Sequence, residues 1–160
     1  MAPRHQHHLS PGQNRATVLA LWSLLFDVLQ PVMTHATIRT LQDCYTLDLL
    51  RAPDNAFEIC RQVHTREVAA RETDRRSLVR RRLQPEALEL DPAAADDAAI
   101  LRLLGPYART EIFTSDDPMP VLASGDALTD LTARLTDEEA KTLSSTLQAA
   151  QLPATVLTGP

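Results

Sequence analysis

The stretch FEICRQVHTREVAARETDRRSLVRRRL, residues 57–83, decides the fold that we predict from this sequence. Apolar residues recur at every second position through much of its first half, a period typical of half-buried β-strands. Thr73-Asp74 marks a turn, and residues 77–83 follow as a return strand. The stretch therefore predicts an antiparallel β-hairpin.

The same hairpin concentrates positive charge, since it holds eight of the fifteen arginines of a chain whose net charge is −5. Residues 86–139, in contrast, contain thirteen acidic residues and three arginines. On the predicted return strand, Arg81 shares one face with Val79 and Leu83. A guanidinium on an apolar face needs a carboxylate, a ligand or water. We therefore expect this region to attract an anionic partner.

Helical spacing of apolar residues, combined with capping residues and terminating prolines, predicts the remaining elements. A weaker helical pattern also runs from residue 37 to about residue 50. The clear helices are residues 15–30, preceded by Asn14 and stopped by Pro31; residues 92–104, preceded by Asp91 and ended by Gly105-Pro106; and residues 137–151, opened by the capping box of Thr136 and Glu139.

A second hairpin is predicted at residues 107–124, with Pro120 on a strand at the edge of the sheet. Two hairpins with helices between them predict an α+β fold, an antiparallel β-sheet built from hairpins with helices packed on it. The predicted organisation is a flexible N-terminal tail at residues 1–13, a single domain at residues 14–152 and a C-terminal tail at residues 153–160.

The sequence contains no metal-centre, phosphate-loop or nucleophile motif, and we expect no cofactor. Cys44 and Cys60 are the only cysteines. Two cysteines favour reduced thiols in a cytoplasmic protein over a disulfide framework. His5, His7 and His8 could bind a transition metal, but we interpret them as part of the flexible tail.

The apolar run at residues 16–26 follows Arg4 and Arg15, which leaves a secretory signal as a second interpretation. Asp27 and Gln30 interrupt the pattern, and the run is too short to cross a bilayer. We prefer a helix that is buried in the core or in an oligomer interface, and we expect no membrane partner.

Three short segments resemble the chorismate lyase and UTRA-like superfamily. They are residues 37–45 (TIRTLQDCY), 66–70 (REVAA) and 78–85 (LVRRRLQP), within a resemblance that covers roughly residues 15–125. The resemblance implies an antiparallel sheet with flanking helices and a closed ligand cavity. It also implies the family's reaction, in which the lyases remove pyruvate from chorismate to leave 4-hydroxybenzoate, without metal or cofactor.

Site residues follow from the same resemblance. In the preferred register, Arg66 is the catalytic arginine that holds a substrate carboxylate, Arg81 supports it, and Ile38 joins the substrate-binding set. A guanidinium suits this role because it can bind a carboxylate bidentately and stabilise developing charge. In a second register, residues 109–128 take the place of the hairpin, and Arg109 binds the substrate.

The family also uses a glutamate on its last strand for proton transfer. The matching residues 118–126 contain no glutamate, although Asp126 lies among them. Glu111, on the preceding arm of the second hairpin, is our candidate catalytic carboxylate. Glu111 does not match the family motif. The prediction of catalysis therefore requires that Glu111 take over the proton-transfer role of the family's glutamate.

The resemblance thus predicts a cofactor-independent carbon–oxygen lyase, acting on a small aromatic or enolpyruvyl carboxylate. Two other classes stay open. One is a non-catalytic domain that binds a small carboxylate, and the other is a homodimeric protein-interaction module with residues 15–30 in its interface. Nucleic acid is disfavoured as a partner because the chain is acidic and the basic stretch at residues 75–82 lacks aromatic residues for base stacking.

Overall fold

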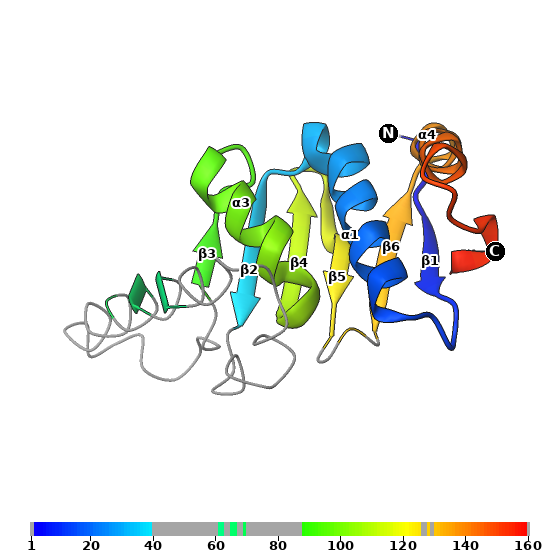
Figure 1. Cartoon of the computed structure of the whole chain (residues 1–160). Coiled ribbons are helices and arrows are strands. Elements are labelled where there is room, and N and C mark those ends of the chain that lie inside the picture. The colour runs from blue at the N-terminus through cyan, green and yellow to red at the C-terminus, as the bar shows by residue number, and fades with distance from the viewer. Residues whose placement is uncertain are drawn as a thin grey trace.

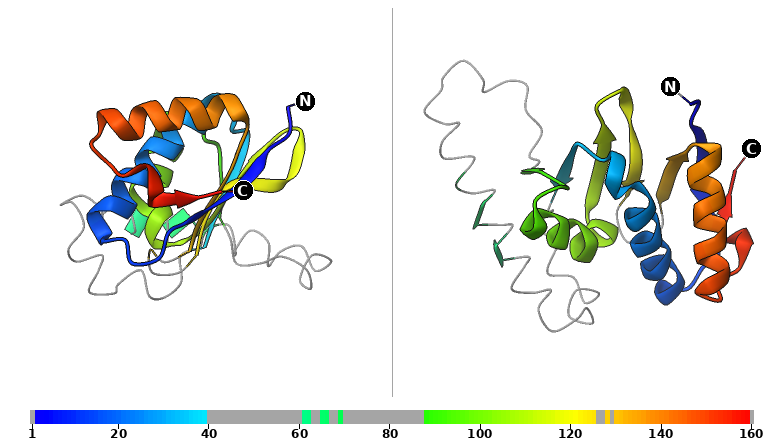
Figure 2. Two further views of the ribbon diagram at one scale, coloured as in Figure 1. Left: turned by 90° about the vertical axis from the view of Figure 1, so that its right-hand side faces the viewer. Right: turned by 90° about the horizontal axis from the view of Figure 1, so that it is seen from above.

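The computed structural model describes residues 2–39, 61–62, 65–66, 69, 88–125, 128 and 130–159. Within them the chain forms an open antiparallel sheet of seven strands in the order β3-β2-β4-β5-β6-β1-β7 (Figure 1). The helices α1, α3 and α4 all lie on one side of this sheet (Figure 2). The predicted α+β class, with helices packed on an antiparallel sheet, is confirmed. The strands are β1 (His5–Leu9), β2 (His35–Arg39), β3 (Leu88–Leu90), β4 (Arg109–Thr114), β5 (Asp117–Ser124), β6 (Leu131–Leu135) and β7 (Leu157–Thr158), and the helices are α1 (Arg15–Leu29), α3 (Ala95–Leu104) and α4 (Asp137–Ala149), with 3₁₀ turns at Gln30–Val32, Gly105–Tyr107 and Ala154–Val156.

Helix α1 lies at the centre of the core and has the bounds that its caps predict. The Asn14 side chain accepts a hydrogen bond from the Thr17 N–H at 2.9 Å, which satisfies a donor of the first turn. With the following 3₁₀ turn, the helix is long and apolar enough to span a membrane by length and composition alone. In this fold it packs against α3, α4 and β5. Its buried residues are Val18, Leu21, Trp22, Leu25, Phe26 and Leu29.

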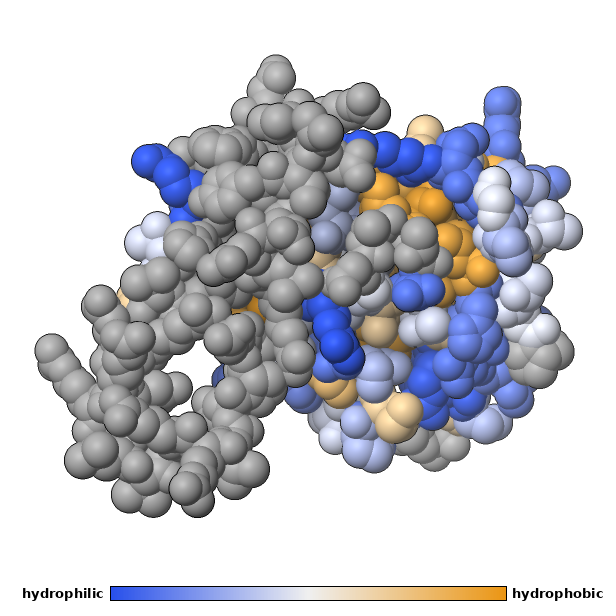
Figure 3. Space-filling model, turned by 90° about the horizontal axis from the view of Figure 1, so that it is seen from below, coloured by the Kyte–Doolittle hydropathy of each residue, from blue (hydrophilic) through white to orange (hydrophobic). Residues whose placement is uncertain are grey.

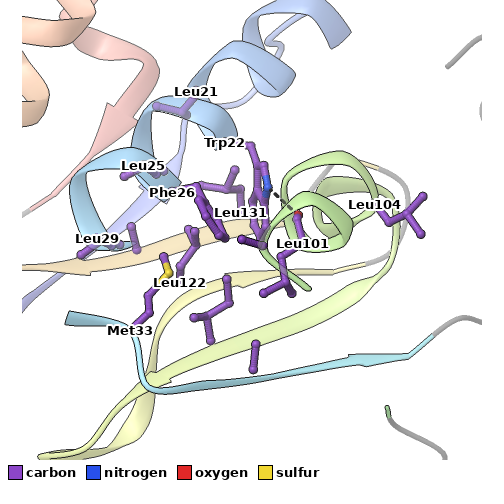
Figure 4. Packing of buried hydrophobic residues seen from close by; sticks show 14 of the residues in the cluster. Leu21, Trp22, Leu25, Phe26, Leu29, Met33, Leu101, Leu104, Leu122 and Leu131 are labelled. Carbon is purple, nitrogen blue, oxygen red and sulfur yellow. Dashed lines mark hydrogen bonds between the residues drawn. The ribbon is translucent and has the colours of Figure 1, made fainter. Parts of the chain in front are cut away.

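The core fills the space between the sheet and the three helices (Figure 4). Strand residues alternate between the two faces of a sheet. Ile38 of β2, Ile112 of β4 and Leu122 of β5 point toward the helices and are fully buried. The residues between them, such as Glu111 and its register partner Ala123, point to the opposite face and are partly exposed. The sheet therefore has one face under α1, α3 and α4 and a second face that these helices do not cover.

Both ends of the described chain belong to the sheet, so the predicted tails are wrong at β1 and β7. β1 pairs antiparallel with β6, from His5 opposite Leu135 to His8 opposite Thr132, and β7 pairs with β1. Arg4 fixes the entry to β1, because its guanidinium binds both oxygens of Glu139 at 2.7 and 2.9 Å. The sequence HQHHL of β1 is polar on both faces, so it lacks the alternation by which a strand is recognised.

Strand β2 occupies the start of the weaker helical pattern predicted from residue 37, and that prediction is wrong for Thr37 to Arg39. These residues pair with β3 on one side and β4 on the other. β-branched Thr37 and Ile38 favour a strand between two neighbours over a helix. The short strands β3 and β6 were not predicted either.

The arginine-rich hairpin predicted at residues 57–83 falls largely outside the described residues, and so do Cys44, Cys60 and His64. Where the structure describes its first arm, at residues 61–62, 65–66 and 69, the conformation is helical. The Thr65 hydroxyl donates to the Arg61 carbonyl, one turn earlier, at 2.8 Å. The predicted strand is therefore wrong at these positions. Short apolar runs such as those of this stretch do not by their period alone separate a strand from a helix.

Helix α3 begins three residues later than predicted, with Ala94 at its N-cap. Asp91 instead closes a turn, since its carboxylate accepts the Ala93 N–H at 2.9 Å.

The second hairpin is confirmed as β4 and β5, but β5 lies between β4 and β6 and is not an edge strand. Of the residues of β5, Leu122 to Ser124 pair with β6, so Pro120 lies beyond that pairing, where its missing N–H does not interrupt the β5–β6 ladder.

Helix α4 confirms the predicted capping box. Thr136 accepts the Glu139 N–H at 3.3 Å, and the Glu139 carboxylate accepts the Thr136 N–H at 2.8 Å.

On the molecular surface seen from below, the described residues are mostly hydrophilic around one hydrophobic area (Figure 3). Apolar areas of this kind are common at the margin of a core.

Candidate ligand-binding groove

An open groove runs between the helical residues 61–62 and 65–66 and the N-terminal half of α3. Its volume is about 910 Å³, within the range of small-molecule sites. Residues 61–62 and 65–66 supply guanidinium, amide and hydroxyl groups, and α3 supplies two carboxylates and an apolar wall. The lining residues are Arg61, Gln62, Thr65 and Arg66 on one side and Asp96, Asp97, Ala99 and Ile100 on the other.

Arg66, the predicted catalytic arginine, lines this groove and holds a carboxylate there. Its Nη1 donates to Oδ1 of Asp97 at 2.9 Å. The Arg66 side chain is 43% exposed and that of Asp97 is 14% exposed. The Arg66 side chain is thus partly open to solvent, while its carboxylate partner is largely covered.

Asp97 is positioned by the turn that precedes α3 as well as by Arg66. Its Oδ2 accepts the Asp91 N–H at 2.9 Å. Burial acts to raise the pKa of Asp97, but the hydrogen bonds from the Asp91 N–H and from Arg66 outweigh it, and the pKa lies below its usual value. Asp97 also stands in the first turn of α3, where the helix dipole favours negative charge. The carboxylate is therefore ionised at neutral pH.

Glu111, the predicted catalytic carboxylate, does not meet Arg66. On β4 it lies between Thr110 and Ile112, which point into the core beneath the helices, so its side chain is on the opposite face of the sheet. Arg66 binds α3, on the helix-covered side. The sheet thus separates the two groups that a shared catalytic site would need.

The other predicted substrate-binding residues are also dispersed. Arg109 is exposed on the same face of β4 as Glu111, and its register partner on β2 is Arg39. Ile38 is fully buried in the core, and Arg81 and Asp126 lie outside the described residues. Among the members of the predicted set that the structure describes, only Arg66 lines the groove.

The N-terminal histidines are divided by the strand that contains them. His5 and His7 point to one face of β1, and His8 points to the other, because successive strand residues alternate. Burial lowers the pKa of His7, and the neighbouring His5 and His8 lower it further. Among the residues that the structure describes, no group of three or more His, Cys, Asp or Glu side chains is arranged to hold a metal ion.

No protein-family model, no curated protein and no solved structure matches this chain. The resemblance to the chorismate lyase and UTRA-like superfamily therefore stays a prediction that rests on three short segments.

Proposed function

We propose that the protein binds a small carboxylate ligand in the groove between α3 and residues 61–62 and 65–66, with Arg66 as the residue that holds the carboxylate. The observation that supports this proposal is the Arg66–Asp97 contact itself. At 2.9 Å, it is a charge-assisted hydrogen bond of ordinary length at the wall of a groove. A carboxylate from outside can use the same guanidinium.

The groove suits a ligand with a flat apolar part. Ala99 and Ile100 give the α3 side an apolar surface, while Gln62 and Thr65 offer polar groups beside Arg66. Small-molecule sites combine these features, with apolar walls that contribute burial and a few polar groups that fix orientation. An aromatic or enolpyruvyl carboxylate, the ligand class that the sequence resemblance implies, has this composition.

Binding without catalysis is the form of the proposal that the geometry favours. The lyase reaction was predicted to use Arg66 and Glu111, and the Glu111 side chain points away from the helix layer that contains the Arg66–Asp97 pair. A lyase-like reaction in this groove would need a proton-transfer group other than Glu111. We therefore treat pyruvate release as a second outcome to be measured in the same samples.

A thermal-shift titration with 4-hydroxybenzoate and with chorismate tests the proposal. A ligand at 100 times its dissociation constant stabilises the folded state by about 2.7 kcal/mol, so the melting temperature should rise with concentration. The neutral 4-hydroxybenzamide should produce no such rise. Arg66→Ala should weaken carboxylate binding by roughly 10- to 100-fold, the usual value of a hydrogen bond between charged groups.

Arg102→Ala is the matched control. Arg102 is a partly exposed arginine of α3, and it pairs with Asp27 and Gln30 instead of Asp97. It should lower the melting temperature of the free protein and leave the ligand-induced shift unchanged. If neither acid shifts the melting temperature, or if Arg66→Ala and Arg102→Ala behave alike, the groove is not a carboxylate site. Pyruvate release from chorismate that requires Arg66 would instead establish the lyase alternative.

A further inference from the structure

The Arg66–Asp97 pair is asymmetric in how its two members are held. Asp97 is fixed at both oxygens, Oδ1 by Arg66 Nη1 at 2.9 Å and Oδ2 by the Asp91 N–H at 2.9 Å. It is also the more covered partner, at 14% exposure against 43% for Arg66. Asp97 therefore keeps its position through its own turn and helix even when Arg66 moves.

Among the described residues that line the groove, two arginines stand against two aspartates. Arg61 and Arg66 face Asp96 and Asp97 across it, so an incoming anion meets two carboxylates as well as two guanidiniums. A ligand carboxylate bound to Arg66 would lie beside Asp97, and like charges at such a distance repel each other. Both carboxylates also require N–H groups from the same planar fork of the guanidinium.

Building on the proposed function, we infer that Asp97 is an internal competitor for the ligand, an autoinhibitory carboxylate that occupies Arg66 until a ligand carboxylate replaces it. The groove then selects ligands whose carboxylate, together with the apolar part that packs on Ala99 and Ile100, binds Arg66 better than Asp97 does. A carboxylate without an apolar part gains little from this exchange, because it replaces one ion pair with another. The ligand class is thus narrowed to carboxylates attached to a ring or another apolar group.

Two variants of Asp97 test the inference by isothermal titration with 4-hydroxybenzoate. Asp97→Asn and Asp97→Ser both remove the charge, and both keep an oxygen that can accept the Asp91 N–H, so at least one should fold. Each should bind the ligand about fivefold more tightly than the parent protein, the factor that corresponds to the upper value of an exposed ion pair. In an Arg66→Ala background the same changes should give no gain.

Asp96→Asn is the matched control, because Asp96 lines the same groove and stands next to Asp97 in the sequence. It removes the same charge without releasing Arg66, so its effect should stay below about twofold. Unchanged or weaker binding by the Asp97 variants would overturn the inference and would make Asp97 a residue that positions Arg66. An equal gain in Asp96→Asn would also overturn it, in favour of general charge repulsion. If the parent and all variants fail to bind, the proposed function falls as well.

Discussion

Trp22 lies directly against Gly105, and neither position leaves space for a larger neighbour. A Cβ atom at position 105 would come within 2.2 Å of Trp22 Cζ2 and 2.8 Å of Cε2. The indole is fully buried, and its Nε1 donates to the Leu101 carbonyl at 3.1 Å (Figure 4). The ring therefore joins α1 to the end of α3, where the chain turns toward β4.

Gly105→Ala should destabilise the fold by about 1–3 kcal/mol, the usual cost of overpacking a core. To move away from the added methyl group, the Trp22 indole would have to lose its hydrogen bond to the Leu101 carbonyl. Urea unfolding measures this cost, and Trp22→Phe supplies the partner for a double-mutant cycle, since a smaller ring makes room for the new methyl group. The double variant should be more stable than the sum of the single effects predicts. Strict additivity would show that the two residues are not in the contact described.

Local signals in the sequence predicted the helices well because those signals act within a few residues. Asn14 caps α1 through Thr17 N–H, and Thr136 and Glu139 open α4. The second hairpin was predicted for the same reason, since its arms are adjacent in the chain. β1 and β2 were missed because their pairing partners lie far away in the sequence. β1, for example, pairs with β6 across more than 120 residues.

The candidate site was predicted only in part. Arg66 was identified from its segment, but its partner Asp97 is 31 residues away, and no local pattern links the two. The first turn of α3 did contain a signal, the pair Asp96-Asp97 after Asp91-Pro92. The sequence could not show that the sheet separates Glu111 from Arg66, because alternation shows which residues share a face of β4 but not which face the helices cover.

Arg4→Ala should release the N-terminal strand and destabilise the protein by about 2 kcal/mol, between the values of exposed and fully buried ion pairs. The two side chains are only 9% and 15% exposed, and Arg4 also donates to the Arg134 carbonyl at 2.9 Å. Hydrogen exchange should increase first in β1 and β7, which pair at this end of the sheet.

His5→Ala is the control for Arg4→Ala. His5 Nε2 lies 3.8 Å from the Asp137 carboxylate, and both side chains are well exposed, so the expected change in unfolding free energy is at most about 0.5 kcal/mol. If the two variants are equally stable, Arg4 does not fix β1 to α4.

Thr110 and Ser124 should substitute for each other. Both hydroxyls are buried, and each lies within hydrogen-bond distance of both the Gly105 and the Ala108 carbonyl oxygens, although each has only one proton to donate. Thr110→Val or Ser124→Ala alone leaves a single O–H, which the remaining hydroxyl can share between the two carbonyls as a three-centre bond, and should cost about 1 kcal/mol. The double variant removes both donors from both carbonyls.

We therefore expect the double variant to lose about 1 kcal/mol more than the two single losses combined, because unsatisfied buried carbonyls carry the full desolvation cost. Denaturant unfolding of the four proteins gives the coupling free energy directly. A coupling of zero would mean that the two hydroxyls act on these carbonyls independently.

His7 should make the fold less stable in mild acid. Its ring lies against Gly159, where an added Cβ would come within 2.2 Å of Nδ1. Burial lowers its pKa, with further lowering by His5 and His8. The unfolded chain therefore takes up the proton at a higher pH than the folded protein does. The contribution of His7 to the stability of the fold is fully present above about pH 6.5, the ordinary pKa of histidine. It falls as the pH decreases toward the lowered pKa of His7 in the folded state.

Urea unfolding at pH 7.5 and at pH 5.5 measures this loss, and His7→Gln should reduce it because the titrating ring is gone. The carboxylates act in a separate range. The hydrogen bonds from Arg134 and the Met119 N–H lower the pKa of Asp117, and that of Asp97 is lowered as well. The stability that these two carboxylates contribute is therefore retained as the pH falls to about 4, and it is lost only at lower pH. A His7→Gln protein that loses as much stability between pH 7.5 and 5.5 as the parent would show that other groups cause the acid sensitivity.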